Sequence, residues 1–148
     1  MTSESKIKYC KAIEEKLVVA RKRLADLRHD TSHSISESQH DLIKSAVERD
    51  IMTQEEVIKG LEEFKEFLGK VEEKSQIEEG AEFSVEFTDS EDKIENAIFA
   101  PLSVSLDGVQ IITQKSPLGA ALQGKKVGES FTYKIVDKDI SGIIRRVE

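Results

Sequence analysis

The sequence has 148 residues, of which only one is cysteine, two are proline, none is tryptophan and 5% are aromatic. Its lone cysteine, Cys10, cannot form an internal disulfide, which predicts a reducing cytoplasm as the compartment. No apolar run approaches the roughly 18 residues of a membrane span, so we expect no membrane partner. The net charge of −7 argues against a protein that coats nucleic acid, because such coating depends on an excess of positive charge.

Proline and glycine are also scarce in the first half, where the first proline is Pro101 and only Gly60 and Gly69 come before residue 80. Nothing there forces a helix to break. Apolar residues recur at spacings of three and four, which is the heptad pattern by which one helix packs on another. They are Cys10, Ile13, Leu17, Ala20, Leu24 and Leu27. We expect Cys10 to be a small core residue of this stripe and not a nucleophile.

A second heptad stripe follows a polar segment at residues 29–36 and keeps its phase across polar Asp50 and Gln54. Its apolar members are Ile43, Val47, Val57, Leu61, Phe64, Leu68 and Val71. Thr53 could cap a new helix, but the steady phase favours one helix. The sequence therefore predicts two antiparallel helices, with Leu24 opposite Val47 and Cys10 opposite Leu61.

The second half changes to the alternation of a strand with one buried face. Strands are predicted over residues 83–87, 94–100, 109–113, 129–136 and 140–147, and Asp137, Lys138 and Asp139 form the last turn. A short helix is expected from Ser116, which caps it, through Pro117 at its first position, to Leu122. The predicted fold is α+β: an antiparallel helical hairpin over 1–75 with a polar tip at 29–41, then a small antiparallel sheet domain with one short helix over 76–148.

Charge is sorted along the predicted hairpin. Residues 6–28 carry a net charge of +5, whereas residues 29–43 carry −3 and hold every histidine of the chain. The acidic residues of the tip are Asp30, Glu37 and Asp41, and its histidines are His29, His33 and His40. A basic shaft with an acidic tip is typical of an element that enters a site where polyanions surround bound cations. Charged helix faces are also common where a helix is simply exposed to solvent, so this second interpretation stays open.

The histidines and acidic residues of the tip also raise the question of a metal site. His29 and His33 are four residues apart, as on one turn of a helix. A stable zinc site also needs a fixed geometry and a second shell, which Ser- and Thr-rich turns rarely supply. We therefore expect surface histidines and no intrinsic metal. No G-x-S-x-G, Walker-type or G-x-G-x-x-G motif occurs either, so we expect no enzyme activity of the chain's own.

The segment SPLGAALQGKKVGESFTY, residues 116–133, resembles the C-terminal domain of the GreA/GreB transcription elongation factors. In that family a Ser-Pro-aliphatic start, a short helix, a Gly-Lys turn and a Val-Gly-acidic turn lead into the last strands. The segment GAEFSVEFTDSEDK, residues 80–93, resembles the start of the same domain. Order and length agree over residues 80–147, and the predicted hairpin lies where the family has its coiled coil.

This resemblance implies an FKBP-like C-terminal domain that docks on the rim of the RNA polymerase secondary channel. The hairpin would then reach the active centre, where acidic tip residues help to hold the polymerase's second Mg²⁺ and an attacking water for transcript cleavage. By position, the docking surface includes Ser116, Pro117 and Leu118. The resemblance further implies nascent RNA near the basic first helix, a monomeric accessory factor, and no cofactor besides the Mg²⁺ of the polymerase.

The tip departs from the family pattern. Cleavage-competent relatives carry a DLKENAEY-like tip, and no such string occurs here. Counting back from Ile58-Lys59, which resembles the return helix, places Glu37 and Asp41 near the two acidic roles, with Asp30 as a possible third carboxylate. Two alternatives to cleavage therefore stay open: a regulator that occupies the channel without cleaving, and an FKBP-like prolyl isomerase or peptide-binding module. The isomerase alternative is weakened by the absence of tryptophan, which such pockets usually contain.

Overall fold

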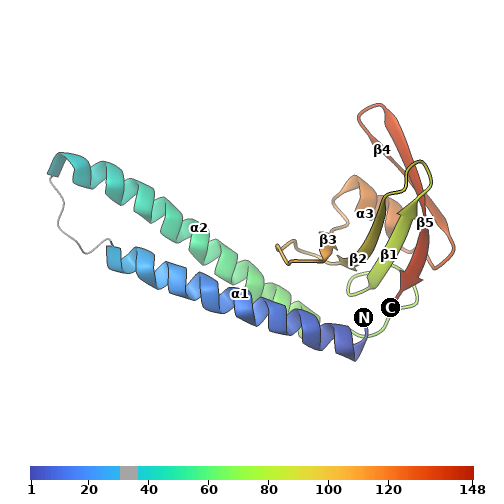
Figure 1. Ribbon diagram of the computed structural model, residues 1–148, viewed down its shortest axis with the longest axis horizontal. Helices are drawn as coiled ribbons and strands as arrows, with labels where there is room; N and C mark the ends of the chain where they lie inside the picture. The colour runs from blue at the N-terminus through green and yellow to red at the C-terminus, as the bar shows by residue number, and fades with distance from the viewer. Residues whose placement is uncertain (31–36) are drawn as a thin grey trace.

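The computed structural model of the chain describes the backbone of residues 1–30 and 37–148 and the side chains of residues 1–29 and 42–148. A pair of long antiparallel helices projects from a curled sheet, as Figure 1 shows. The helices of the hairpin are α1 (Ser3–Asp30) and α2 (Glu37–Gly69). The remaining elements are β1 (Glu82–Phe87), β2 (Lys93–Phe99), β3 (Gln110–Ile112), α3 (Pro117–Leu122), β4 (Ser130–Ile135) and β5 (Lys138–Val147).

The two long helices begin and continue as their sequences favour. The hydroxyl of Thr2 accepts a hydrogen bond from the backbone N–H of Ser5 at 3.2 Å, which caps the start of α1. The helix α2 runs unbroken through Thr53, as the constant heptad phase predicted. The Thr53 hydroxyl donates a hydrogen bond of 2.9 Å to the carbonyl oxygen of Arg49, so it bonds within the helix and starts no new one.

The base of the hairpin holds a hydrophobic core that we call the hairpin core. Its buried members come from both helices and the residues that flank them, from β2 and from the loop after β2. They are Met1, Tyr9, Ile13, Leu17, Leu61, Phe64, Leu68, Val71, Ile98, Ala100, Leu106 and Val109. Cys10 is half-buried and packs against this core, in agreement with its predicted role. Because the loop at residues 100–109 closes the core from the sheet side, the hairpin and the sheet are packed together at this end.

The register of the two helices differs from the prediction. Arg28 pairs with Glu55 at 2.8 Å, where the predicted register would have placed Ile43 opposite it. Arg21 pairs with Glu62 at 2.9 Å, which agrees with the same corrected register. The predicted register was wrong because it assumed that the two helices extend equally far from the middle of the polar segment. Packing in the hairpin core instead determines which residues of α1 and α2 lie opposite each other.

The described strands form one sheet with the order β3-β2-β1-β5-β4. Three of its pairings are antiparallel, but β2 and β3 run parallel, with Ile98 beside Ile111. The predicted all-antiparallel sheet is therefore wrong at β3. The cause is the loop at residues 100–109, which carries the chain back to the level of Ala97 before β3 begins, so that β3 runs in the same direction as β2.

A second hydrophobic core, the sheet core, lies between the sheet and α3. Its buried members are Ile77, Phe83, Val85, Ile94, Ala97, Phe99, Leu122, Phe131 and Ile144. Strand β2 serves both cores because its side chains alternate: Ala97 and Phe99 face the sheet core, and Ile98 faces the hairpin core. The hairpin core thus contains residues from both sides of the predicted boundary near residue 76, and the division into two domains stays a prediction.

The last turn of the sheet also differs from its predicted position. Strand β5 begins at Lys138, which pairs with Ile135, so the loop between β4 and β5 consists of Val136 and Asp137 alone. The predicted strand over 129–136 is therefore one residue too long at this end, and the predicted turn at 137–139 begins one residue too late. Within the part of the chain that the structure describes, no helix combines the length and the apolar character that a membrane crossing needs.

Candidate functional site

The Ser-Pro-Leu segment of the predicted docking surface begins α3. The Ser116 hydroxyl accepts the backbone N–H of Gly119 at 3.0 Å and donates to the carbonyl oxygen of Thr113 at 2.9 Å. Ser116 is therefore the N-cap of the helix, and Pro117 follows at the first helical position, as predicted. Pro117 is exposed, whereas Leu118 is half-buried against the sheet core. Among these three residues, the Pro117 ring is the part most available to a partner.

Gly119 explains why the helix can lie so close to the end of β3. A Cβ atom at this position would lie 1.9 Å from the carbonyl oxygen of Thr113, which is a steric clash with backbone. Gly119 is buried and lets α3 close over the sheet core. The Ser-Pro-Leu-Gly segment therefore sets the position of α3, and any docking surface on α3 depends on it.

The predicted tip carboxylates cannot be placed in the same way. The side chains of Asp30, Glu37 and Asp41 lie outside the described residues, as do those of His33 and His40. Of the tip histidines, the structure describes only His29, which is exposed. Within residues 1–29 and 42–148, no group of His, Cys, Asp or Glu side chains is arranged to hold a metal ion.

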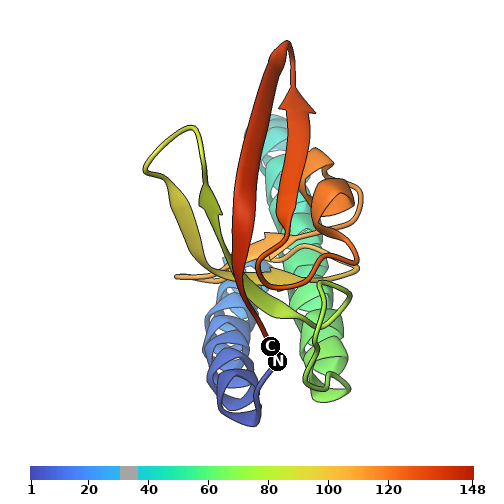
Figure 2. The same cartoon turned by 90° about the vertical axis from the view of Figure 1, so that its right-hand side faces the viewer.

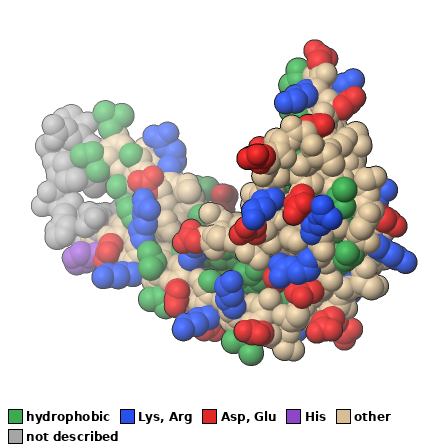
Figure 3. Space-filling model, turned by 45° about the vertical axis from the view of Figure 1, so that its right-hand side comes forward, with side chains coloured by type: hydrophobic (Ala, Val, Ile, Leu, Met, Phe, Trp, Pro, Cys, Tyr) green, Lys and Arg blue, Asp and Glu red, His purple; other side chains and the backbone are tan. Residues whose placement is uncertain are grey.

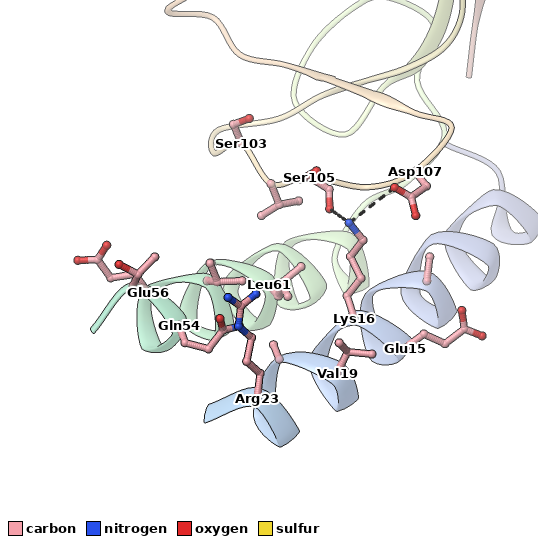
Figure 4. Close-up of a pocket in the computed structure, with 16 residues that line it drawn as sticks. Glu15, Lys16, Val19, Arg23, Gln54, Glu56, Leu61, Ser103, Ser105 and Asp107 are labelled. Atoms are coloured by element: carbon pink, nitrogen blue, oxygen red, sulfur yellow. Dashed lines mark hydrogen bonds and ion pairs between the residues drawn. The ribbon is translucent and has the colours of Figure 1, made fainter. Parts of the chain in front are cut away.

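A cavity of about 880 Å³ lies where the hairpin meets the loop at residues 103–107. Figure 4 shows α1 and α2 as its floor and the loop as its roof, with Lys16 reaching between them. The Lys16 ammonium donates to the carbonyl oxygen of Ser105 at 2.7 Å and lies 3.9 Å from the Asp107 carboxylate. Exposed Val19 and Val57 line the floor, and the lining contains no aromatic side chain. The cavity therefore lacks the aromatic wall of a prolyl isomerase pocket.

A polar cluster also joins the hairpin to the sheet. The Glu82 side chain is buried and accepts a hydrogen bond of 3.2 Å from Arg146, which also donates to the side chain of Asn96 at 3.1 Å. Burial and the nearby Glu82 carboxylate raise the pKa of Tyr9 on α1 to about 12. This cluster ties α1, β1, β2 and β5 together, so it stabilises the attachment of the hairpin.

The positive charge of α1 is partly neutralised by α2. Arg21 and Arg28 form ion pairs with acidic residues of α2. A third pair has the opposite polarity, because Glu14 of α1 lies 2.7 Å from Lys65 of α2. Figure 3 shows basic and acidic side chains interspersed over the visible face of both the hairpin and the sheet. Other basic side chains of α1, among them Lys11 and Lys22, are exposed and available to an anionic partner.

The C-terminal sheet and α3 correspond to a known domain. A family model described as "Transcription elongation factor, GreA/GreB, C-term" matches residues 72–148, which is more than half of the chain. The chain belongs to the GreA/GreB family. This GreA/GreB protein is accordingly a member of a transcription elongation factor family, that is, of accessory factors to transcription. The resemblance seen over residues 80–147 is confirmed, and the match extends back to residue 72.

The solved structures similar to this GreA/GreB protein include factors from Thermus and Nitrosomonas. Thermus aquaticus Gfh1 is 20% identical, with a TM-score of 0.42, over 98% of this chain and 92% of its own. The GreA factor homolog 1 (Gfh1) protein of Thermus thermophilus is 19% identical, with a TM-score of 0.40 and coverages of 98% and 93%. A GreA/GreB factor from Nitrosomonas europaea is 18% identical, with a TM-score of 0.40 and coverages of 68% and 91%. Curated protein sequences contained no match to this chain.

Sequence reasoning missed two features of this GreA/GreB protein. The cavity needs residues from α1, α2 and the loop at 103–107, which no local pattern connects. The buried Glu82 did carry a signal, since it stands directly before the apolar residues of β1 and opposite the Arg-rich end of β5. Its pairing with Arg146 depends on the order of the strands, which the sequence pattern did not predict.

Proposed function

We propose that this chain binds RNA polymerase at the secondary channel, in the cytoplasm, and modulates backtracked transcription complexes. The sheet domain docks at the rim of the channel, and the hairpin enters it. The observation that carries this proposal is that a GreA/GreB C-terminal domain is joined to a long hairpin that projects away from it. A rigid attachment at the hairpin core supports it, because a probe must be held in a fixed direction.

The docking surface that we propose is built around Ser116, Pro117 and Leu118. Their position at the start of α3 supports this assignment, because Pro117 is exposed and the segment is held by two hydrogen bonds of Ser116. The exposed lysines of α1 are proposed to lie near nascent RNA, where they would screen phosphate charge. The factor acts as a monomer in this proposal.

We propose that three carboxylates of the tip approach the polymerase active centre: Glu37 and Asp41, with Asp30. Carboxylate oxygens are the ligands that Mg²⁺ prefers, so these side chains would complete the binding of the second polymerase Mg²⁺. The metal belongs to the polymerase, and the chain brings no cofactor of its own. Through this contact the factor would stimulate the polymerase's own cleavage of a backtracked transcript.

The test is transcript cleavage in a stalled, backtracked elongation complex. Wild-type protein is expected to accelerate cleavage, and the double variant Glu37→Ala/Asp41→Ala is expected to lose about tenfold or more of that acceleration. The double variant should still bind the polymerase, because its docking surface is unchanged. Equal cleavage with both proteins would refute the carboxylate assignment.

A second candidate is a regulator that occupies the channel without stimulating cleavage. The observation that favours it is the tip sequence, in which Glu37 and Asp41 are four residues apart and no DLKENAEY-like string occurs. This candidate predicts polymerase binding with cleavage no faster than in the absence of the factor. The same assay therefore separates the two, provided that binding to the polymerase is measured alongside.

A prolyl isomerase or peptide-binding function has little support. The family match is to transcription elongation factors, and the chain contains no tryptophan. Isomerisation of a short proline peptide should proceed at the uncatalysed rate in the presence of the protein. An accelerated rate would revive this alternative.

A further inference from the structure

The hairpin formed by β4 and β5 extends well beyond the rest of the sheet, as Figure 2 shows. Its apex is the loop of Val136 and Asp137, with Ile135 directly before it. Val136 is 87% exposed, and Ile135 is 48% exposed. These apolar side chains contribute no hydrophobic burial to the stability of the fold, because they belong to neither of its two cores.

The backbone at this apex is unfavourable for the residue that occupies it. Val136 has φ of +54°, and no other non-glycine residue in the described part of the chain has a positive φ. A β-branched residue is a poor choice there, since two-residue hairpin loops normally use Gly, Asn or Asp at such a position. Strained residues of this kind are concentrated at functional sites, where their side chains serve a purpose that the fold itself does not need.

The charges around the apex indicate what kind of partner it meets. Lys134 and Lys138 are matched by Asp137 and Asp139, so the tip carries no net charge. Figure 3 shows hydrophobic, basic and acidic side chains together on the projection at the top of the molecule. A tip without net charge is not steered towards a phosphate backbone or an anionic lipid surface. A convex apolar tip within a ring of both charges instead fits a concave apolar socket on a protein.

The hairpin that carries this tip also borders the surface already proposed for docking. Helix α3, which begins with Ser116 and Pro117, packs beside β4, and Figure 2 shows it on the β4 side of the sheet. We infer that Val136, with Ile135, is an apolar anchor that inserts into a hydrophobic socket on RNA polymerase and extends the docking surface of α3. This inference rests on the proposed function, because it takes the polymerase as the partner.

The test uses two substitutions at the same position. Val136→Gly removes the anchor and eases the backbone, because glycine adopts a positive φ freely. Val136→Ile keeps an apolar, β-branched side chain on the same backbone. Binding of each full-length protein to purified core RNA polymerase is measured, together with its midpoint of thermal unfolding. Val136→Gly should bind about tenfold more weakly while unfolding at the same or a higher temperature, and Val136→Ile should bind within about twofold of wild type.

Each outcome separates this inference from the proposed function. If the wild-type protein does not bind the polymerase, the proposed function fails and this inference fails with it. If wild type binds and Val136→Gly binds equally well, the anchor is refuted while the proposed function stands. Weaker binding by Val136→Gly together with a lowered unfolding temperature would indicate a structural role, and would also count against the anchor.

Discussion

The base and the outer part of the helical hairpin carry the same heptad pattern but are packed very differently. At the base, Ile13, Leu17 and Phe64 are buried within the hairpin core. In the outer part, the seam residues Ile43 and Val57 are 43% and 45% exposed. The neighbouring Leu42 and Met52 of α2 are exposed as well. The pattern therefore predicts which side of each helix is apolar, but not whether that side is covered.

The difference comes from a third packing surface. Two helices alone can each bury only one stripe, because the rest of each helix faces water. At the base, the loop at residues 100–109 adds Ala100, Leu106 and Val109, which close the core over the helices. In the outer part, Val57 faces the cavity under the loop, and the corrected register leaves Ile43 of α2 beyond the end of α1. Ion pairs such as Arg28–Glu55 link the helices at the surface there. Such exposed pairs contribute little stability, so the base holds the hairpin in place.

The largest effect is expected from truncating a side chain of the base. Phe64→Ala should lower the free energy of unfolding by about 3–5 kcal/mol, because it removes a fully buried ring and leaves a cavity. Ile43→Ala, in the outer part, should cost no more than about 1 kcal/mol. Urea denaturation of both full-length variants measures the contrast. Similar losses in the two variants would mean that the outer seam is as well packed as the base.

A smaller loss is expected from the polar cluster that joins the hairpin to the sheet. Arg146→Ala should destabilise the protein by about 3 kcal/mol, because it leaves the buried Glu82 carboxylate without its charged partner. The adjacent Arg145 offers a matched control, since it pairs with the exposed Glu86. Arg145→Ala should change the free energy by no more than about 0.5 kcal/mol. If the two variants unfold alike, the buried pair does not hold the junction.

A third, pH-dependent loss of stability is expected from Tyr9, the residue of α1 that lies near Glu82. The pKa of Tyr9 is about 12 in the folded protein, against 10 for the free side chain. The folded state therefore keeps the phenol proton over a range in which the unfolded state releases it, and stability is lost as pH rises from about 10 to 12. The loss should be about 2 kcal/mol. Tyr9→Phe should remove this component from the alkaline unfolding profile, and an unchanged profile would contradict it.

Several elements could be predicted from the sequence because their signals are local. Ser116 and Pro117 predict the start of α3 by capping and by the fixed φ of proline, and both occupy those positions. The alternation of Phe83 and Val85 predicts β1, since every second side chain in a strand faces the same side. The GreA/GreB C-terminal domain could likewise be identified from residues 80–93 and 116–133. The tip carboxylates stay a prediction, because their side chains lie outside the described residues.

Other features depend on contacts between distant segments and could not be predicted in that way. Strand β3 is parallel to β2 because the loop between them crosses the hairpin core. The predicted strand over 129–136 includes Val136, but the pairing of Ile135 with Lys138 places Val136 in the turn. The sequence by itself determined the helices, the strands and the apolar side of each, since these follow from periods of 3.6 and 2. Only the tertiary structure decided the helix register, the burial of Glu82 beside Arg146 and the exposure of the outer seam, because each depends on which surfaces meet.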